Sequence, residues 1–169
     1  MNTIWMHGMG GSPNQEKIAL MEKYGLTTHA LHMDYSNEPQ RFEILRDYCL
    51  EHEIKFLVGS SFGGFMGFWL SEELGLPCLL LNPAVSLSGK NKTKPQSMTR
   101  LISKLCLVAV GDQDSQIDHQ RTLKFMDKDR RDGKTILTKV MENEGHGFSM
   151  EAFQEILEWG LECLKKHGQ

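Results

Sequence analysis

The chain has 169 residues, of which 40% are hydrophobic and 24% are charged, a composition that excludes disordered and fibrous proteins. Its formal net charge of −3 provides no positive field for a phosphate backbone, so we expect no nucleic-acid partner. No apolar run approaches the roughly 20 residues that span a membrane, and no signal peptide precedes the first apolar segment, so we expect a cytoplasmic protein with no membrane partner.

Short apolar runs alternate with longer amphipathic segments, and no repeat, low-complexity tract or linker divides the chain. The apolar runs predict strands over residues 3–7, 28–35, 54–59, 77–82, 105–110 and 135–141. Strands that alternate with helices imply parallel pairing with helices on both faces of the sheet. We therefore expect one domain over residues 1–169, an α/β/α sandwich of three layers with a mostly parallel sheet of about six strands. In such sheets ligands bind beyond the carboxyl ends of the strands.

The first strand is followed by the turn HGMGGSP. An HG turn at this point commonly presents the next backbone amide to a nucleophile, so we expect Met9 N–H to be one donor of an oxyanion hole, with His7 and Gly8 beside the substrate. A phosphate-binding loop is the competing interpretation, but the glycines do not form G-x-G-x-x-G and no Lys-Ser/Thr pair follows. The next helix should begin with Ser12 as its N-cap and end at Gly25.

The third strand ends in the sequence GSSFG, which satisfies G-x-S-x-G with Ser61 at its centre and precedes an apolar helical run. This is the strand–turn–helix context of a nucleophile elbow, in which glycines at positions 59 and 63 allow a very tight turn. The helix start directs free amides at the same point, so Phe62 N–H is the second expected oxyanion donor. A simple Gly/Ser turn is the alternative, and Ser60 is a weaker candidate for the nucleophile.

The connection over residues 86–104 follows the fourth strand and is polar and basic. It has no acidic residue, and its basic residues are Lys90, Lys92, Lys94, Arg100 and Lys104. A small lid over an anionic substrate is one interpretation. A solvated surface crossover is the other, and it is the commoner role of such a loop.

Acidic residues cluster after the fifth strand in the sequence GDQDSQID. A serine nucleophile needs a histidine base, and the base needs a carboxylate that holds its tautomer. Asp114 has the preferred spacing for this acid, and Asp112 and Asp118 are alternatives. Some of these acids could instead cap the helix that follows.

The sixth strand is followed by EGHGF, which places His146 in a loop flanked by glycines and makes it the best candidate for the base. A solvated surface histidine is the alternative. Phe148 in the same loop, together with Met9 and Phe62, is expected to line an acyl pocket. The last helix should be capped by Ser149.

The four cysteines, Cys49, Cys78, Cys106 and Cys163, are isolated from one another. No CxxC pair or histidine at zinc spacing accompanies them. We expect buried, reduced thiols and no metal site.

Taken together, the segments MHGMGGSP, VGSSFGGFMGFWL, LLLNPAV, VAVGDQDSQI and EGHGFSMEAF resemble the α/β-hydrolases, and specifically the small capless bacterial esterases of the YqiA type. The order Ser61, Asp114, His146 is the order of that superfamily. The resemblance implies ester hydrolysis without a metal or organic cofactor, with Ser61 as nucleophile, His146 as base and Asp114 as acid. Some relatives place the acid directly after the glycine, which would select Asp112.

These observations predict a serine hydrolase that cleaves carboxylic esters of small acyl groups through an acyl-enzyme. The expected partner is a small ester or thioester. A thioesterase with the same three residues is one alternative, and a fold retained only to bind a ligand or partner protein is another. A peptidase has little support.

Overall fold

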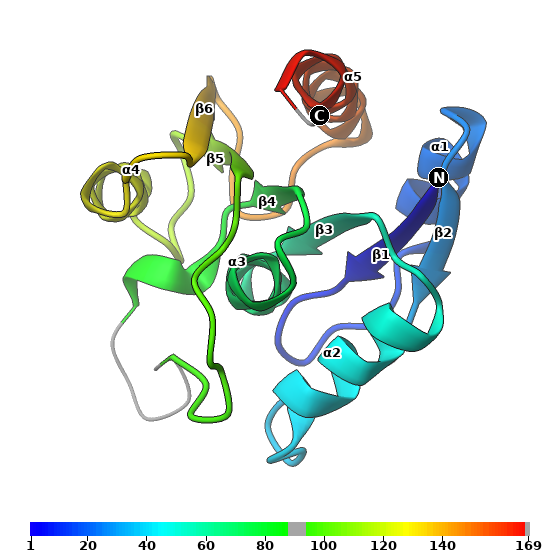
Figure 1. Ribbon diagram of the computed structural model, residues 1–169. Coiled ribbons are helices and arrows are strands. Elements are labelled where there is room, and N and C mark those ends of the chain that lie inside the picture. The colour runs from blue at the N-terminus through cyan, green and yellow to red at the C-terminus, as the bar shows by residue number, and fades with distance from the viewer. Residues whose placement is uncertain (88–93, 168–169) are drawn as a thin grey trace.

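The computed structural model describes residues 1–87 and 94–167. Within these residues the sheet has six strands in the order β2-β1-β3-β4-β5-β6, and every neighbouring pair is parallel (Figure 1). The strands are β1 (Asn2–Met6), β2 (Thr27–Ala30), β3 (Phe56–Ser60), β4 (Cys78–Leu81), β5 (Leu105–Gly111) and β6 (Thr135–Met141). The predicted fold class is confirmed.

Helices cover both faces of the sheet, with α1 and α5 on one face and α2, α3 and α4 toward the other (Figure 1). Their bounds are α1 (Gln15–Lys23), α2 (Arg41–Glu51), α3 (Phe62–Leu74), α4 (His119–Lys128) and α5 (Met150–His167), with a short 3-10 turn η1 (Ala84–Ser86). Alternate strand residues point to opposite faces. In β1, accordingly, Ile4 and Met6 pack with the α2–α4 core, whereas Trp5 packs with the core of α1 and α5.

Strand β2 is shorter than expected: it ends at Ala30, whereas the sequence predicts a strand to residue 35. Its partner β1 ends at Met6, so the sheet offers no further ladder on that side. Beyond it, Met33 N–H donates to Nε2 of His7 at 2.9 Å, a side-chain partner that replaces the missing strand. The backbone amide of Met33 therefore has a hydrogen-bond partner although it is not part of a strand.

The predicted helix boundaries are correct in two cases and wrong in one. Asn14, not Ser12, is the N-cap of α1, and its side chain accepts from Lys17 N–H at 2.9 Å. The expected end at Gly25 is confirmed by its positive φ of 81°. Ser149 caps α5 as expected, because its Oγ accepts from Ala152 N–H at 3.2 Å.

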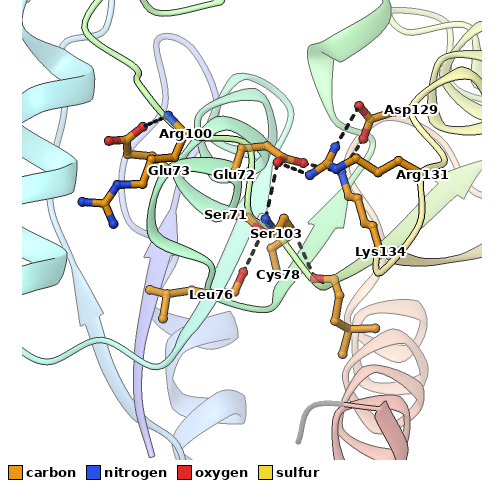
Figure 2. A network of polar contacts seen from close by, with 11 residues as sticks. Ser71, Glu72, Glu73, Leu76, Cys78, Arg100, Ser103, Asp129, Arg131 and Lys134 are labelled. Atoms are coloured by element: carbon orange, nitrogen blue, oxygen red, sulfur yellow. Dashed lines mark hydrogen bonds and ion pairs between the residues drawn. The ribbon is translucent and has the colours of Figure 1, made fainter.

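A buried charge network fixes the C-terminal end of α3 (Figure 2). Glu72 is fully buried and pairs with Arg131 and Lys134, and Lys134 also pairs with Asp129. Burial alone would lower the pKa of Lys134, but its hydrogen bonds to Asp129 and Glu72 outweigh burial and raise that pKa. The loop that precedes β6 is thereby tied to α3.

The neighbouring Glu73 holds the later part of the basic connection against α3. Its carboxylate accepts from Thr99 N–H at 2.8 Å and from Arg100 N–H at 3.0 Å. Residues 88–93 of the connection, which include Lys90 and Lys92, lie outside the described residues.

The four cysteines are all buried and reduced, as expected. Among the described residues, no helix is long and apolar enough to cross a bilayer.

Candidate active site

Ser61 occupies the turn between β3 and α3 with φ 55° and ψ −116°, a combination that residues with side chains rarely adopt. The two glycines around it are required by close backbone contacts. A Cβ at Gly59 would lie 2.3 Å from the carbonyl oxygen of Gly63, and a Cβ at Gly63 would lie 2.2 Å from that of Met6. The turn is therefore a tight strand-to-helix elbow, as the spacing predicts.

The hydroxyl of Ser61 does not cap the helix that follows it. Ser61 is the N-cap of α3, yet its side chain makes no capping hydrogen bond. Its Oγ lies instead 3.0 Å from Nε2 of His146. The first amides of α3, beginning with Phe62 N–H, have no partner inside the helix, because helical bonding starts with Phe65 N–H and the carbonyl oxygen of Ser61.

His146 is bound on its other side by Asp114, whose Oδ2 lies 2.8 Å from Nδ1. A carboxylate accepts only, so Nδ1 carries the proton and Nε2 faces Ser61 with its lone pair. The Asp114 side chain is fully buried, and its Oδ1 accepts from the backbone amides of Gln116 and Ile117. This carboxylate is therefore held in place by the turn that bears it.

The structure separates the three acids that the sequence left open. Asp114 contacts His146, whereas Asp112 accepts from Asn143 N–H at 2.7 Å. Asp118 is the N-cap of α4 and accepts from the amides of Gln120 and Arg121. Asp112 thus braces the histidine loop, and Asp118 serves the helix.

A cavity of about 180 Å³ opens at Ser61. It is lined by Met9, Ser61, Phe62, Ala84, Leu87, Gln116, Ile117 and His146. A larger hollow of about 300 Å³ lies between α2, α3 and residues 94–97, but it contains no comparable group of Ser, His and Asp. Chemistry, not size, therefore selects the smaller cavity as the candidate site.

Two residues expected beside the substrate lie elsewhere. His7 and Phe148 are buried, and neither lines the cavity. Phe148 packs in the core with α5, because the staple position before the helix cap faces inward. Gly8 lies against Ser61, since a Cβ there would be 3.3 Å from Cβ of Ser61.

His7 supports the turn that bears Met9. Nε2 accepts from Met33 N–H, so the ring proton is on Nδ1 and is donated to the carbonyl oxygen of Gly8 at 2.8 Å. Burial lowers the pKa of His7, and the nearby charge of His32 acts in the same direction. The ring is therefore neutral, and both of its nitrogens are used in fixing backbone.

The end of β4 contributes residues that the sequence analysis missed. Ala84 and Leu87 line the cavity, and Asn82 is a buried residue with a positive φ of 42°. A search of every strand end would have included this one, because the carboxyl ends of all parallel strands meet at one edge. The asparagine directly after an apolar strand was the available signal.

Two family models match the chain. The model of an uncharacterised protein family (UPF0227) matches residues 2–99, more than half of the chain, and that of the prolyl oligopeptidase family matches residues 86–167. The first match contains Ser61, and the second contains Asp114 and His146.

Solved structures share the fold at low sequence identity. An α/β serine hydrolase homologue from Coxiella burnetii has a TM-score of 0.71 at 19% identity, with 97% of this chain and 85% of that chain covered. Est1E from Butyrivibrio proteoclasticus, solved with ferulic acid bound, has a TM-score of 0.71 at 14% identity, with coverages of 98% and 88%. A serine hydrolase without a lid from Xanthomonas campestris has a TM-score of 0.69 at 16% identity, with coverages of 96% and 81%. With the match over residues 2–99, the chain belongs to the uncharacterised protein family UPF0227, and it has the α/β-hydrolase fold.

Proposed function

We propose that the protein is a serine hydrolase that cleaves carboxylic esters of small acyl groups through an acyl-enzyme intermediate. The observation that carries the proposal is the continuous hydrogen-bonded chain from Ser61 through His146 to Asp114, with distances of 3.0 and 2.8 Å. A hydroxyl is a poor nucleophile unless a base accepts its proton, and the lone pair on Nε2 faces that hydroxyl.

In the proposed reaction, Ser61 Oγ attacks the ester carbonyl while His146 Nε2 takes the hydroxyl proton. Asp114 stabilises the resulting imidazolium through Nδ1–H. The tetrahedral oxyanion would accept from the backbone amides of Met9 and Phe62, two residues that line the same cavity as Ser61. The C–O bond to the alcohol then breaks, and His146 returns its proton to the departing oxygen. Water, activated by the same histidine, hydrolyses the acyl-enzyme.

The cavity supports small, uncharged acyl groups. Its volume of about 180 Å³ is below the range of roughly 300–1,000 Å³ typical of sites for drug-sized ligands. Among the described residues that line it, Ser61, His146 and Gln116 are polar and the others are apolar. Est1E, with ferulic acid bound, provides an example of this fold holding a carboxylic acid.

The test is hydrolysis of p-nitrophenyl acetate, butyrate and octanoate by the wild type and by Ser61→Ala. Losing the nucleophile should lower kcat/KM by at least about 10³-fold. Ser60→Ala, one residue earlier in β3, is the matched control and should retain full activity. A Ser61→Ala protein that keeps its activity would refute the proposal.

Two further substrate types distinguish the related activities. A matched thioester series separates a thioesterase from an esterase, since the same three residues serve both reactions. Peptide p-nitroanilides test the activity suggested by the prolyl oligopeptidase match. A fluorophosphonate probe that fails to label the wild type would favour a binding module over any of these enzymes.

A further inference from the structure

Asn82 lies where the histidine loop must cross the sheet. Ser61 follows β3 and His146 follows β6, and β4 and β5 lie between them. Neighbouring strands are about 4.8 Å apart, so the loop must reach across about 14 Å to bring His146 to Ser61. Asn82 directly follows β4, beneath this crossing, and is 1% exposed.

The side chain of Asn82 joins the histidine loop to β5. Its Nδ2 donates to the carbonyl oxygens of Gly145 and His146, at 3.0 Å each, and its Oδ1 accepts from Gly111 N–H at 2.8 Å. Two acceptors on one side and a donor on the other require a carboxamide in one orientation. No other side chain of this length supplies two donors and an acceptor together.

The backbone around Asn82 is bound to the nucleophile. Ser61 N–H donates to the carbonyl oxygen of Leu81 at 2.9 Å, and Ala84 N–H donates to the carbonyl oxygen of Ser61 at 2.9 Å. Asn82 N–H donates to the carbonyl oxygen of Ala109 in β5 at 2.8 Å. The segment 81–84 therefore holds the backbone of Ser61 on one side and that of His146 on the other.

Gly111 completes the seat of the loop. A Cβ at this position would lie 2.3 Å from the carbonyl oxygen of Glu144 and 2.8 Å from that of Gly145, so the loop backbone rests directly on the end of β5. This contact is van der Waals packing, which excludes positions that are too close. Glu144 and Asn143 are also hydrogen-bonded to the turn after β5, but the two bonds from Asn82 are directional and act on the carbonyl oxygens of Gly145 and His146 themselves.

We propose that Asn82 is a positioning residue that sets the distance between His146 and Ser61 by tethering the histidine loop to the strand segment that holds the nucleophile. It touches neither substrate nor the reacting atoms, and it acts through the backbone of His146. The inference rests on the proposed function for its effect on rate, but its effect on geometry can be measured separately.

The first variant is Asn82→Gly, which suits the left-handed backbone and removes all three side-chain hydrogen bonds. The second is Asn82→Asp, which retains the shape and the acceptor but turns a carboxylate oxygen toward two carbonyl oxygens. Asn143 is the matched control, because it also has a positive φ, lies in the histidine loop and is exposed. Asn143→Gly, which keeps the backbone amide that binds Asp112 and adds no charge beside that carboxylate, should behave as the wild type.

We expect both Asn82 variants to lower kcat on a short p-nitrophenyl ester by about 10- to 100-fold, with KM changed less than about threefold, because small misplacements of a catalytic group cost rate. The downfield NMR signal of His146 Nδ1–H should broaden or disappear in Asn82→Gly, while circular dichroism and cooperative unfolding show that the fold remains. A purely structural role would lower stability without changing that proton signal.

The inference is overturned if Asn82→Gly retains kcat within about threefold of wild type, or if it loses activity while the His146 signal is unchanged. Should Asn82→Asp fail to fold, Asn82→Gly alone decides. A wild type that hydrolyses none of the esters would refute the proposed function and not the tether. In that case the His146 Nδ1–H signal in Asn82→Gly alone would test the tether: a broadened or absent signal would support it, and an unchanged signal would refute it.

Discussion

The strained backbone of Ser61 should lower the stability of the protein, and replacing Ser61 by glycine should reveal by how much. With φ 55° and ψ −116°, Ser61 lies outside the regions that residues with a Cβ prefer. Such conformations cost about 1–3 kcal/mol each. Glycine adopts them freely, whereas alanine retains the Cβ and with it the strain.

The informative comparison is between Ser61→Gly and Ser61→Ala, since both remove the hydroxyl and its hydrogen bond to His146. At an ordinary position glycine is less stable than alanine by about 0.5–1 kcal/mol, because it loses more conformational freedom on folding. It also forgoes the contact of one partly buried carbon, which is worth less than the roughly 0.8 kcal/mol of a fully buried one. Relief of strain outweighs both, so the glycine variant should be more stable by about 1 kcal/mol.

Urea unfolding followed by circular dichroism measures the difference, with equal m-values as the check that the same transition is compared. A gain of about 1 kcal/mol corresponds to roughly 2–4 °C in Tm for a chain of this size. Gly75→Ala, at a φ of 71° on the C-cap of α3, is a positive control that should lose stability. If Ser61→Gly is instead less stable than Ser61→Ala by the roughly 0.5–1 kcal/mol expected at an ordinary position, the elbow stores no strain and the reasoning is wrong.

Three further predictions concern the elements around the site. Gly63→Ala should destabilise the protein by at least about 2 kcal/mol in urea unfolding, because the new Cβ would lie 2.2 and 2.4 Å from the carbonyl oxygens of Met6 and His7. Gly67→Ala is the control and should cost less, because its Cβ would meet only side-chain ends at 3.1 Å. Burial lowers the pKa of His7, so the contribution of its neutral ring to the free energy of unfolding is complete above the ordinary pKa of about 6.5 and is lost as the pH falls below it. Between pH 8 and pH 5, the free energy of unfolding should therefore decline less steeply in His7→Gln than in the wild type. Lys134→Met leaves the buried Glu72 with Arg131 as its remaining ionic partner and should cost about 3 kcal/mol, part of which Glu72→Gln should restore in the double variant.

The meeting of Ser61, His146 and an acidic residue could be predicted from the sequence, because these residues lie in short segments at strand ends. Ser61 required only a strand, two glycines and a helix around it, and these are visible as VGSSFGGF. His146 required a loop between the last strand and the last helix. Parallel topology then brings the two ends to one edge, so the convergence follows from the fold class and from no detail of packing.

The choice of acid could not be made in the same way. Asp112, Asp114 and Asp118 lie within seven residues, and each is a plausible acceptor by type and spacing. The turn after β5 decides between them, because it directs one carboxylate at His146, one at Asn143 N–H and one at the amides of α4. The conformation of that turn is not reported by any periodicity in the sequence.

Buried polar side chains that serve distant backbone were the least predictable part. The imidazole of His7 bonds to Met33 N–H, and the carboxamide of Asn82 bonds to carbonyl oxygens more than 60 residues away. Their partners are backbone groups, which every residue carries, so the sequence at the partner position holds no trace of the contact. Such tethers are needed here because the topology brings Ser61 and His146 only to the same edge of the sheet. To bring Ser61 Oγ and His146 Nε2 within 3.0 Å of each other, the protein depends on directional hydrogen bonds between loops that belong to no strand ladder.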